Sequence, residues 1–133
     1  MTIIKDFILQ VLSQNYIKHS AVAHMLNQET ESKEFKTISL SLPRHCGKST
    51  TILEMYRPGD LIVIRDLNRI KQYNKSVSII TIKDLEDKCE FFNMYKEEER
   101  IKKYNFIFFD ECKIPDIIYK INLAKVYISL RTD

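Results

Sequence analysis

Apolar residues recur at helical spacing in the first part of the chain, over Thr2–Asn27. A period of three to four residues places them on one face of a helix. The residues that share this spacing are Ile4, Phe7, Ile8, Val11, Leu12, Ala21, Val22 and Met25. The pattern weakens at Asn15–Ser20, so we expect a break there, with Ser20 as the cap of a second helix. The polar segment Gln28–Lys36 is expected to be a connection.

Five short apolar runs follow, each rich in β-branched or aromatic residues and bounded by polar or turn residues, which predicts β-strands. The predicted strands are Thr37–Leu42, Leu61–Arg65, Val77–Thr81, Phe106–Phe109 and Lys125–Ser129. Lys48–Tyr56 is predicted to be a short helix, which the turn residues Arg57–Asp60 end. Asp66–Lys75 is predicted to be a polar crossover.

Two further helices are predicted in the second half of the chain. Asp84–Tyr104 carries an apolar stripe at helical spacing, followed by the charged run Lys96–Lys103. The residues of this stripe are Leu85, Cys89, Phe92 and Tyr95. Pro115–Leu123 begins with proline, which is favoured in the first turn of a helix.

Strands that alternate with helices predict a parallel sheet covered on both faces. We therefore expect one α/β domain over residues 1–133, built as a three-layer sandwich around a mostly parallel five-stranded sheet. Residues 1–36 would form an N-terminal helical segment, and residues 37–133 would form the core.

The composition is that of an ordinary globular domain, and it leaves nucleic-acid binding open. The 133 residues are 44% hydrophobic and 29% charged, which is ordinary for a globular domain. The net charge of +3 permits nucleic-acid binding without indicating it. The most basic stretches, Arg65–Lys75 and Arg100–Lys103, alternate with apolar residues, so we expect solvated faces there rather than phosphate contacts.

Cysteine spacing and the N-terminus bear on the cellular compartment. Cys46, Cys89 and Cys112 are far apart and form no CxxC pair, which argues against a zinc site or a disulfide framework. Met1–Leu12 is amphipathic and lacks the features of a signal peptide. No apolar run approaches the ~20 residues that span a bilayer. We expect a soluble, cytoplasmic protein that does not interact with membranes.

The stretch after the first predicted strand has the pattern of a phosphate-binding loop, or Walker A motif. Its residues are Pro43, Arg44, His45, Cys46, Gly47, Lys48, Ser49 and Thr50. Such a loop needs a strand, converging backbone amides, and then Gly-Lys-Ser/Thr at the start of a helix. Gly47 would let the backbone bend around a phosphate, Lys48 would bridge the β- and γ-phosphates, and the Ser49 hydroxyl would ligate Mg²⁺. The usual first glycine of the pattern is replaced by Leu42.

A second constellation supports this interpretation. The apolar run Tyr104–Phe109 leads directly into Asp110 and Glu111, as in a Walker B motif. A carboxylate at the end of a strand faces the crevice in which open α/β sheets bind ligands. Asp110 would hold magnesium through its water shell, and Glu111 would polarise the attacking water. A strand that merely ends at a polar turn is the simpler alternative.

The end of the last predicted strand carries candidate sensors of the γ-phosphate. In P-loop proteins with a catalytic glutamate after the magnesium aspartate, the next strand usually inserts between the two motif strands. Ser129, Arg131 and Thr132 could then approach the nucleotide. A plain C-terminal strand with a frayed tail would give the same pattern.

Arginine makes forked, charge-assisted bonds to phosphate, so Arg44 is a candidate catalytic residue within the loop. Its alternative is a surface salt bridge. His45 is expected to fill the variable part of the loop, and Cys46 is given no catalytic role.

Together these motifs resemble the ATPase domain of phage terminase large subunits, which are DNA-packaging P-loop NTPases of the RecA/ASCE-like type. In that family the first motif often carries an arginine, as Arg44 does here, and a helical segment precedes the first motif strand. The resemblance implies ATP and Mg²⁺ as cofactors, double-stranded DNA as a candidate partner, and a homo-oligomer or larger assembly. If the chain is viral, the host cytoplasm would be its location. Terminases are longer and add a nuclease domain, so the chain would be a minimal relative, a fragment or a regulator.

Function is therefore expected to be Mg²⁺-dependent ATP hydrolysis coupled to DNA packaging or nucleic-acid translocation. The alternatives are a thymidine-kinase-like nucleoside kinase, which shares the Gly-Lys-Ser/Thr loop and the Asp-Glu strand end, and a non-catalytic nucleotide-binding module or regulator. The kinases of that class need a zinc ribbon that the cysteine pattern does not supply.

Overall fold

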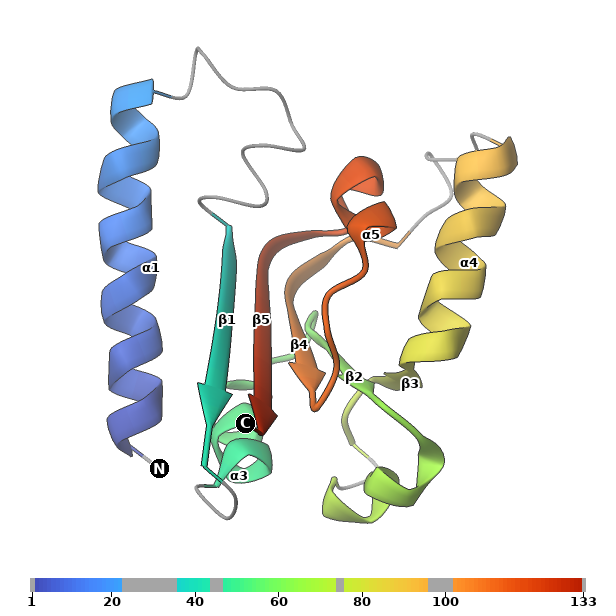
Figure 1. Cartoon of the computed structure of the whole chain (residues 1–133), viewed down its shortest axis with the longest axis horizontal. Helices are drawn as coiled ribbons and strands as arrows, with labels where there is room; N and C mark the ends of the chain where they lie inside the picture. The colour runs from blue at the N-terminus through green and yellow to red at the C-terminus, as the bar shows by residue number, and fades with distance from the viewer. Residues whose placement is uncertain (1, 23–35, 44–46, 74–75, 96–101, 133) are drawn as a thin grey trace.

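The computed structural model describes residues 2–22, 36–43, 47–73, 76–95 and 102–132. Helices and strands alternate along most of this chain (Figure 1). The elements are α1 Thr2–Val22, β1 Thr37–Leu42, α3 Lys48–Met55, β2 Leu61–Ile64, the 3₁₀ segment η2 Leu67–Gln72, β3 Ile79–Thr81, α4 Ile82–Tyr95, β4 Tyr104–Asp110, α5 Asp116–Ile121 and β5 Ala124–Thr132.

The strands form a single five-stranded sheet in the order β1-β5-β4-β2-β3, and every neighbouring pair is parallel. The expected five-stranded α/β sheet is confirmed, and it is wholly rather than mostly parallel. Because all strands run the same way, their carboxyl ends meet at one edge, near α3 and η2 in the view of Figure 1. The last strand, β5, lies between β1 and β4, which brings three strand ends together.

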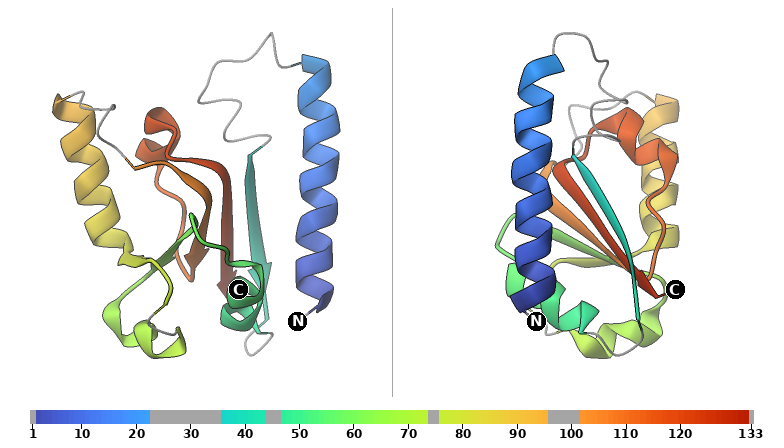
Figure 2. Two further views of the ribbon diagram at one scale, coloured as in Figure 1. Left: turned by 180° about the vertical axis from the view of Figure 1, so that it is seen from behind. Right: turned by 60° about the vertical axis from the view of Figure 1, so that its left-hand side comes forward.

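Two apolar clusters cover the two faces of the sheet, so the molecule has three layers. Alternate residues of each central strand enter opposite clusters: Ile107 and Phe109 belong to one, and Phe108 belongs to the other. The first cluster packs against α4 and α5, and the second packs against α1 and α3. Figure 2 shows α1 on one side of the sheet and α4 on the other. Continuous apolar runs are the expected pattern for strands buried on both faces.

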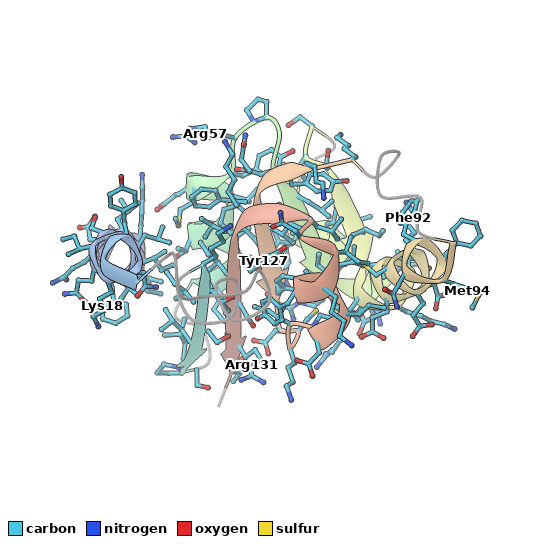
Figure 3. All side chains as sticks on the ribbon, turned by 90° about the horizontal axis from the view of Figure 1, so that it is seen from above. Lys18, Arg57, Phe92, Met94, Tyr127 and Arg131 are labelled. Carbon is cyan, nitrogen blue, oxygen red and sulfur yellow. The ribbon has the colours of Figure 1, made fainter. Side chains whose placement is uncertain are left out.

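Aromatic and aliphatic side chains pack in the centre of the molecule. Tyr127, labelled at the centre of Figure 3, is fully buried and lies edge-on to Tyr119 of α5. Its hydroxyl accepts a hydrogen bond from the backbone N–H of Ala124 at 3.1 Å, which satisfies its polar end inside the core. In contrast, Met94 of α4 is exposed.

The first helix differs from its prediction. α1 continues without a break through Asn15–Ser20, so Ser20 does not begin a second helix within the described chain. Tyr16 and Ile17 are largely exposed, which shows that this turn lies on the solvent side. Polar residues there interrupt the apolar stripe without interrupting the helix. The rest of the predicted second helix falls in residues 23–35, outside the described residues.

Strand lengths also differ, for a reason that lies in the sheet. β5 extends to Thr132 because it pairs on one side with β1 and on the other with β4. The crossover predicted at Asp66–Lys75 contains the 3₁₀ segment η2, whose first turn Asp66 caps by accepting from the Asn68 N–H at 3.0 Å. No helix in the described ranges is long and apolar enough to cross a membrane.

A turn with one buried carboxylate, Asp60, fixes the amino ends of β2 and β4. Gly59 has φ of 99°, a left-handed conformation that glycine adopts without strain. Its carbonyl accepts from the Asn105 N–H at 3.0 Å. The adjacent Asp60 carboxylate accepts from the N–H groups of Phe106 at 3.0 Å and Arg57 at 2.9 Å. This turn therefore holds the start of β4 in register with β2.

Candidate functional site

Polar and charged side chains gather at the carboxyl edge of the sheet. Three strand ends and one crossover supply them, although the residues are far apart in sequence. The contributors are Lys48 and Ser49 after β1, Asp110 and Glu111 at the end of β4, Thr132 at the end of β5, and Arg69, Gln72 and Tyr73 on or next to η2. Parallel topology explains this meeting, since ligands of open α/β sheets bind at this edge.

The turn between β1 and α3 ends in a left-handed glycine. Gly47 has φ of 84° and ψ of 35° and is the N-cap of α3. Its carbonyl accepts from both the backbone N–H and the hydroxyl of Thr51, each at 2.9 Å, which closes the first helical turn. The first amides of a helix have no partner within it, and they favour anions. Lys48 and Ser49 thus stand at a helix N-terminus that faces the carboxyl edge.

Three side chains contact one another at this edge: those of Lys48, Glu111 and Thr132. Lys48 Nζ lies 3.0 Å from Glu111 Oε1 and donates to Thr132 Oγ1 at 2.9 Å. Thr132 donates its hydroxyl to Glu111 Oε1 and its backbone N–H to Glu111 Oε2, the latter at 3.1 Å. Burial alone would raise the pKa of Glu111, but the bonds from Thr132 and Lys48 lower it to about 2. Glu111 is therefore a carboxylate at neutral pH.

The backbone at Glu111 is in an uncommon conformation. Its φ of 61° is left-handed, which costs a residue with a side chain on the order of 1 kcal/mol or more. Its N–H still donates to the Leu130 carbonyl at 2.9 Å, so the ladder to β5 continues past Asp110. This backbone turn places adjacent carboxylates in different surroundings, Glu111 with Lys48 and Asp110 with η2.

Asp110 is completely buried and receives three donors. Arg69 Nη2 lies 2.9 Å from Asp110 Oδ1, while Ser49 Oγ lies 3.1 Å from Oδ2. The hydroxyl of Tyr73 also donates to Oδ2. Burial, and then the charge of Asp110, raises the pKa of Tyr73, so this phenol remains a donor. These three donors hold the buried carboxylate of Asp110 in one orientation.

Gln72 contacts the same serine from the other side. Ser49 Oγ is within hydrogen-bond distance of Gln72 Oε1 as well as of Asp110 Oδ2. A hydroxyl has one proton, so Ser49 donates fully to only one of these acceptors at a time. Side chains of η2 therefore contact both Ser49 and Asp110, so this segment lines the site together with the strand ends and α3.

Sequence reasoning missed the part of the site that η2 supplies. Arg69 belongs to a stretch that was expected to be solvated, yet its side chain is only 20% exposed and pairs with Asp110. The signal that could have found it is a spacing in the crossover that follows an apolar strand: Gln72 and Tyr73 come three and four residues after Arg69. The remaining basic residue of the strand end, Arg65, is 62% exposed, as expected.

The predicted sensors do not behave alike. Thr132 contacts Lys48 and Glu111, as described above. Ser129 lies deeper in the sheet, where its hydroxyl donates to the Cys112 carbonyl at 2.6 Å instead. Arg131 is half-buried, and its Nε is buried without a hydrogen-bond partner among the described residues.

The loop residues are described only in part. Pro43 and Thr50 are exposed, and neither makes a side-chain contact of the kind seen for Lys48 and Ser49 in the described structure. Arg44, His45 and Cys46, predicted as phosphate-binding residues, lie outside the described residues.

The oxygens of Ser49 and Asp110 fit a magnesium ion. When Ser49 donates its proton to Asp110, its lone pairs remain available to a cation, and the carboxylate supplies negative charge beside it. Magnesium is commonly held by one or two protein oxygens together with water and the phosphates of a substrate. Across the described ranges no group of three or more His, Cys, Asp or Glu side chains could hold a metal by itself.

Comparisons with known proteins do not extend this picture. No family model matches the chain, and neither a curated protein nor a solved structure matches it significantly. The class that fold and site define is an α/β protein with a parallel five-stranded sheet and a charged cluster at its carboxyl edge. Any functional argument rests on the residues of that cluster.

Proposed function

We propose that the protein is a P-loop nucleoside triphosphatase that binds ATP with Mg²⁺ and hydrolyses it. One observation carries this proposal: Lys48 and Ser49, at the start of a helix after left-handed Gly47, lie against Glu111 and Asp110 at the end of a parallel strand. A lysine and a hydroxyl at a helix N-terminus suit a polyphosphate, and adjacent acids suit a metal and a water.

Binding requires rearrangement of the contacts around Lys48. Its side chain is 8% exposed, and its ammonium group is already paired with Glu111. To reach a phosphate, Lys48 would exchange this carboxylate for phosphate oxygens, while the first backbone N–H groups of α3 would donate hydrogen bonds to the same anion. Gly47 allows close approach because it has no side chain above the backbone.

Hydrolysis would follow from the two acids. Glu111, released from Lys48, would accept a hydrogen bond from the attacking water and orient it toward the γ-phosphate. In the ion-paired state the bonds from Thr132 and Lys48 lower the pKa of Glu111 to about 2, so it enters this step as a carboxylate that can accept that bond. Bound Mg²⁺ would supply positive charge to the phosphates, and Asp110 and Ser49 would hold it. Thr132 touches both Lys48 and Glu111, so it is the best placed of the predicted sensors.

The wider role that we propose is a terminase-like motor for DNA packaging or nucleic-acid translocation. The position of β5 between β1 and β4 supports the RecA/ASCE-like subclass, in which motors are common. Such a motor would act on double-stranded DNA as a homo-oligomer or within a larger assembly. A thymidine-kinase-like nucleoside kinase and a non-catalytic nucleotide-binding module are the competing functions.

The test is phosphate release from ATP with Mg²⁺, with and without double-stranded DNA. Wild type is compared with Lys48→Ala and Glu111→Gln, and with the matched controls Lys125→Ala and Glu90→Gln, whose side chains are exposed. We expect both site variants to lose turnover by about 100-fold or more and both controls to retain it. Stimulation by DNA would support the motor.

Other outcomes separate the alternatives. ATP binding that depends on Lys48 but is never followed by turnover, with or without DNA, would identify a binding module. Phosphate transfer to thymidine would identify a kinase. If the wild-type protein binds no nucleotide in the presence of Mg²⁺, the proposed function is wrong.

A further inference from the structure

We infer that Arg69 is a nucleotide-contacting residue that exchanges partners: it neutralises Asp110 before magnesium binds and turns to the phosphates afterwards. The inference deepens the proposed function and rests on it. Its starting point is the ion pair of 2.9 Å between Arg69 Nη2 and Asp110 Oδ1. Asp110 is 0% exposed and Arg69 is 20% exposed, so the pair stands largely out of water.

Both acids of the described site are paired with a cation in this state. Lys48 neutralises Glu111, and Arg69 neutralises Asp110. A magnesium ion beside Asp110 and Ser49 would meet the guanidinium at the same carboxylate. Two cations on one carboxylate repel each other, and in a buried site this repulsion is poorly screened. The guanidinium is therefore expected to leave Asp110 when the metal arrives.

Arg69 has unused donors for a second partner. Its Nε is buried and has no hydrogen-bond partner in the described structure, and the contact to Asp110 uses Nη2 alone. A guanidinium offers five donors in a fixed fork that matches phosphate oxygens. The phosphates of a nucleotide held by Lys48 and Ser49 are the nearest anions that the proposed function supplies. Arg69 would thus add positive charge where the transferred phosphoryl group develops negative charge.

The segment that carries Arg69 is suited to this change. η2 is a short 3₁₀ segment between β2 and β3, and 3₁₀ geometry is used in short connectors and hinges. Its neighbour Tyr73 is buried and remains bonded to Asp110, which anchors the end of the segment. Leu67 and Ile70 are exposed, so the rest of η2 is not fixed by the core.

The experiment compares Arg69→Gln and Arg69→Lys with the matched control Arg65→Gln, an arginine that is 62% exposed and contacts its neighbour Asp66. Three quantities are measured: affinity for a non-hydrolysable ATP analogue with Mg²⁺, Mn²⁺ affinity of the nucleotide-free protein by electron paramagnetic resonance, and turnover of ATP with Mg²⁺. Manganese stands in for magnesium as a paramagnetic probe of the same oxygen ligands.

For Arg69→Gln we expect opposite changes in the two affinities. Affinity for the nucleotide with Mg²⁺ should fall about tenfold or more, because a charge-assisted fork to the phosphates is lost. Mn²⁺ affinity should rise roughly threefold or more, because the substitution removes the guanidinium that competes with the metal for Asp110. Turnover should fall by about 100-fold or more. Arg69→Lys keeps the charge, so it should leave Mn²⁺ affinity near the wild-type value while weakening ATP binding.

A merely structural arginine would give a different result, because its loss would weaken metal and nucleotide binding together. Unchanged ATP affinity in Arg69→Gln, or Mn²⁺ affinity that falls or does not change, overturns the inference. These outcomes leave the proposed function intact if the wild type still binds ATP through Lys48. Absence of nucleotide binding in the wild type would overturn both.

Discussion

Lys48 Nζ and Glu111 Oε1 lie 3.0 Å apart, so the lysine that follows Gly47 is bonded to the acid that follows β4. The pair joins the first and fourth strands of the chain across β5, which lies between them. Thr132, at the end of β5, completes the contact by bonding both partners. The residues proposed to bind phosphate and to orient water therefore restrain each other before a ligand arrives.

Glu111→Gln should separate affinity from turnover. The change removes the charge that holds Lys48, so Lys48 becomes more available to phosphate, and ATP should bind about threefold more tightly or better. Turnover should nevertheless be lost, because the amide cannot orient water as the carboxylate does. Equilibrium dialysis with labelled ATP measures the affinity, and Glu90→Gln on the exposed face of α4 is the control. Weaker binding in Glu111→Gln would show that Glu111 does not compete for Lys48.

Thr132→Val should impair turnover more than folding. Valine keeps the shape of threonine but removes the hydroxyl that contacts Lys48 and Glu111. We expect turnover to fall by about tenfold or more, with ATP affinity changed less. Steady-state kinetics with a range of ATP concentrations separates these effects.

Ser129→Ala is the companion variant, and it should behave in the opposite way. Its hydroxyl bonds the buried Cys112 carbonyl and not Lys48 or Glu111. Removing it should lower the free energy of unfolding by about 1–2 kcal/mol and leave turnover unchanged. A loss of turnover in Ser129→Ala without loss of stability would contradict the placement of Ser129 outside the site.

Asp60→Ala should destabilise the fold at the edge of the sheet opposite the site. The buried carboxylate accepts the backbone N–H groups of Arg57 and Phe106, and alanine leaves both without that acceptor. We expect the free energy of unfolding to fall by about 2–3 kcal/mol, measured by urea denaturation. Asp66→Ala, which removes an exposed cap from η2, should cost less than about 1 kcal/mol. Equal losses in the two variants would contradict the role given to the buried Asp60 carboxylate.

Cys89 and Cys112 should resist alkylation in the folded protein. Burial raises the pKa of the Cys89 thiol to about 11, with further contributions from Glu86 and Glu90. Burial and then the charge of Asp110 raise the pKa of Cys112 to about 12. The thiolate is the reactive form, and at pH 8 roughly one Cys89 thiol in a thousand would be ionised.

The measurement is iodoacetamide labelling at pH 8, followed by peptide mapping with mass spectrometry. Labelling of both cysteines should be slow in buffer and fast in denaturant. Because both pKa values lie above 9, raising the pH from about 8 to about 9 should speed labelling of the folded protein by about tenfold. Rapid labelling of either residue in the native protein would show that it is not buried as described.

Much of the fold follows from the order of apolar runs. Thr37–Leu42 was predicted with the bounds that the structure gives, and four further strands were predicted near their observed positions. The errors lie where tertiary contacts decide length or continuity. β5 continues to Thr132 because two neighbours pair with it, and α1 continues past Asn15 although polar residues there interrupt its apolar stripe.

The motif residues could be placed at one edge of the sheet from the amino-acid order alone: Lys48 and Ser49 follow the first strand, and Asp110 and Glu111 come at the end of the fourth. Their partners could not be read in the same way. Arg69 reaches Asp110, and Thr132 rather than Ser129 reaches Lys48, because strand order and side-chain direction set those distances. A strand pattern records which residues are apolar, whereas a contact between chain-distant side chains depends on how the strands are arranged in the sheet.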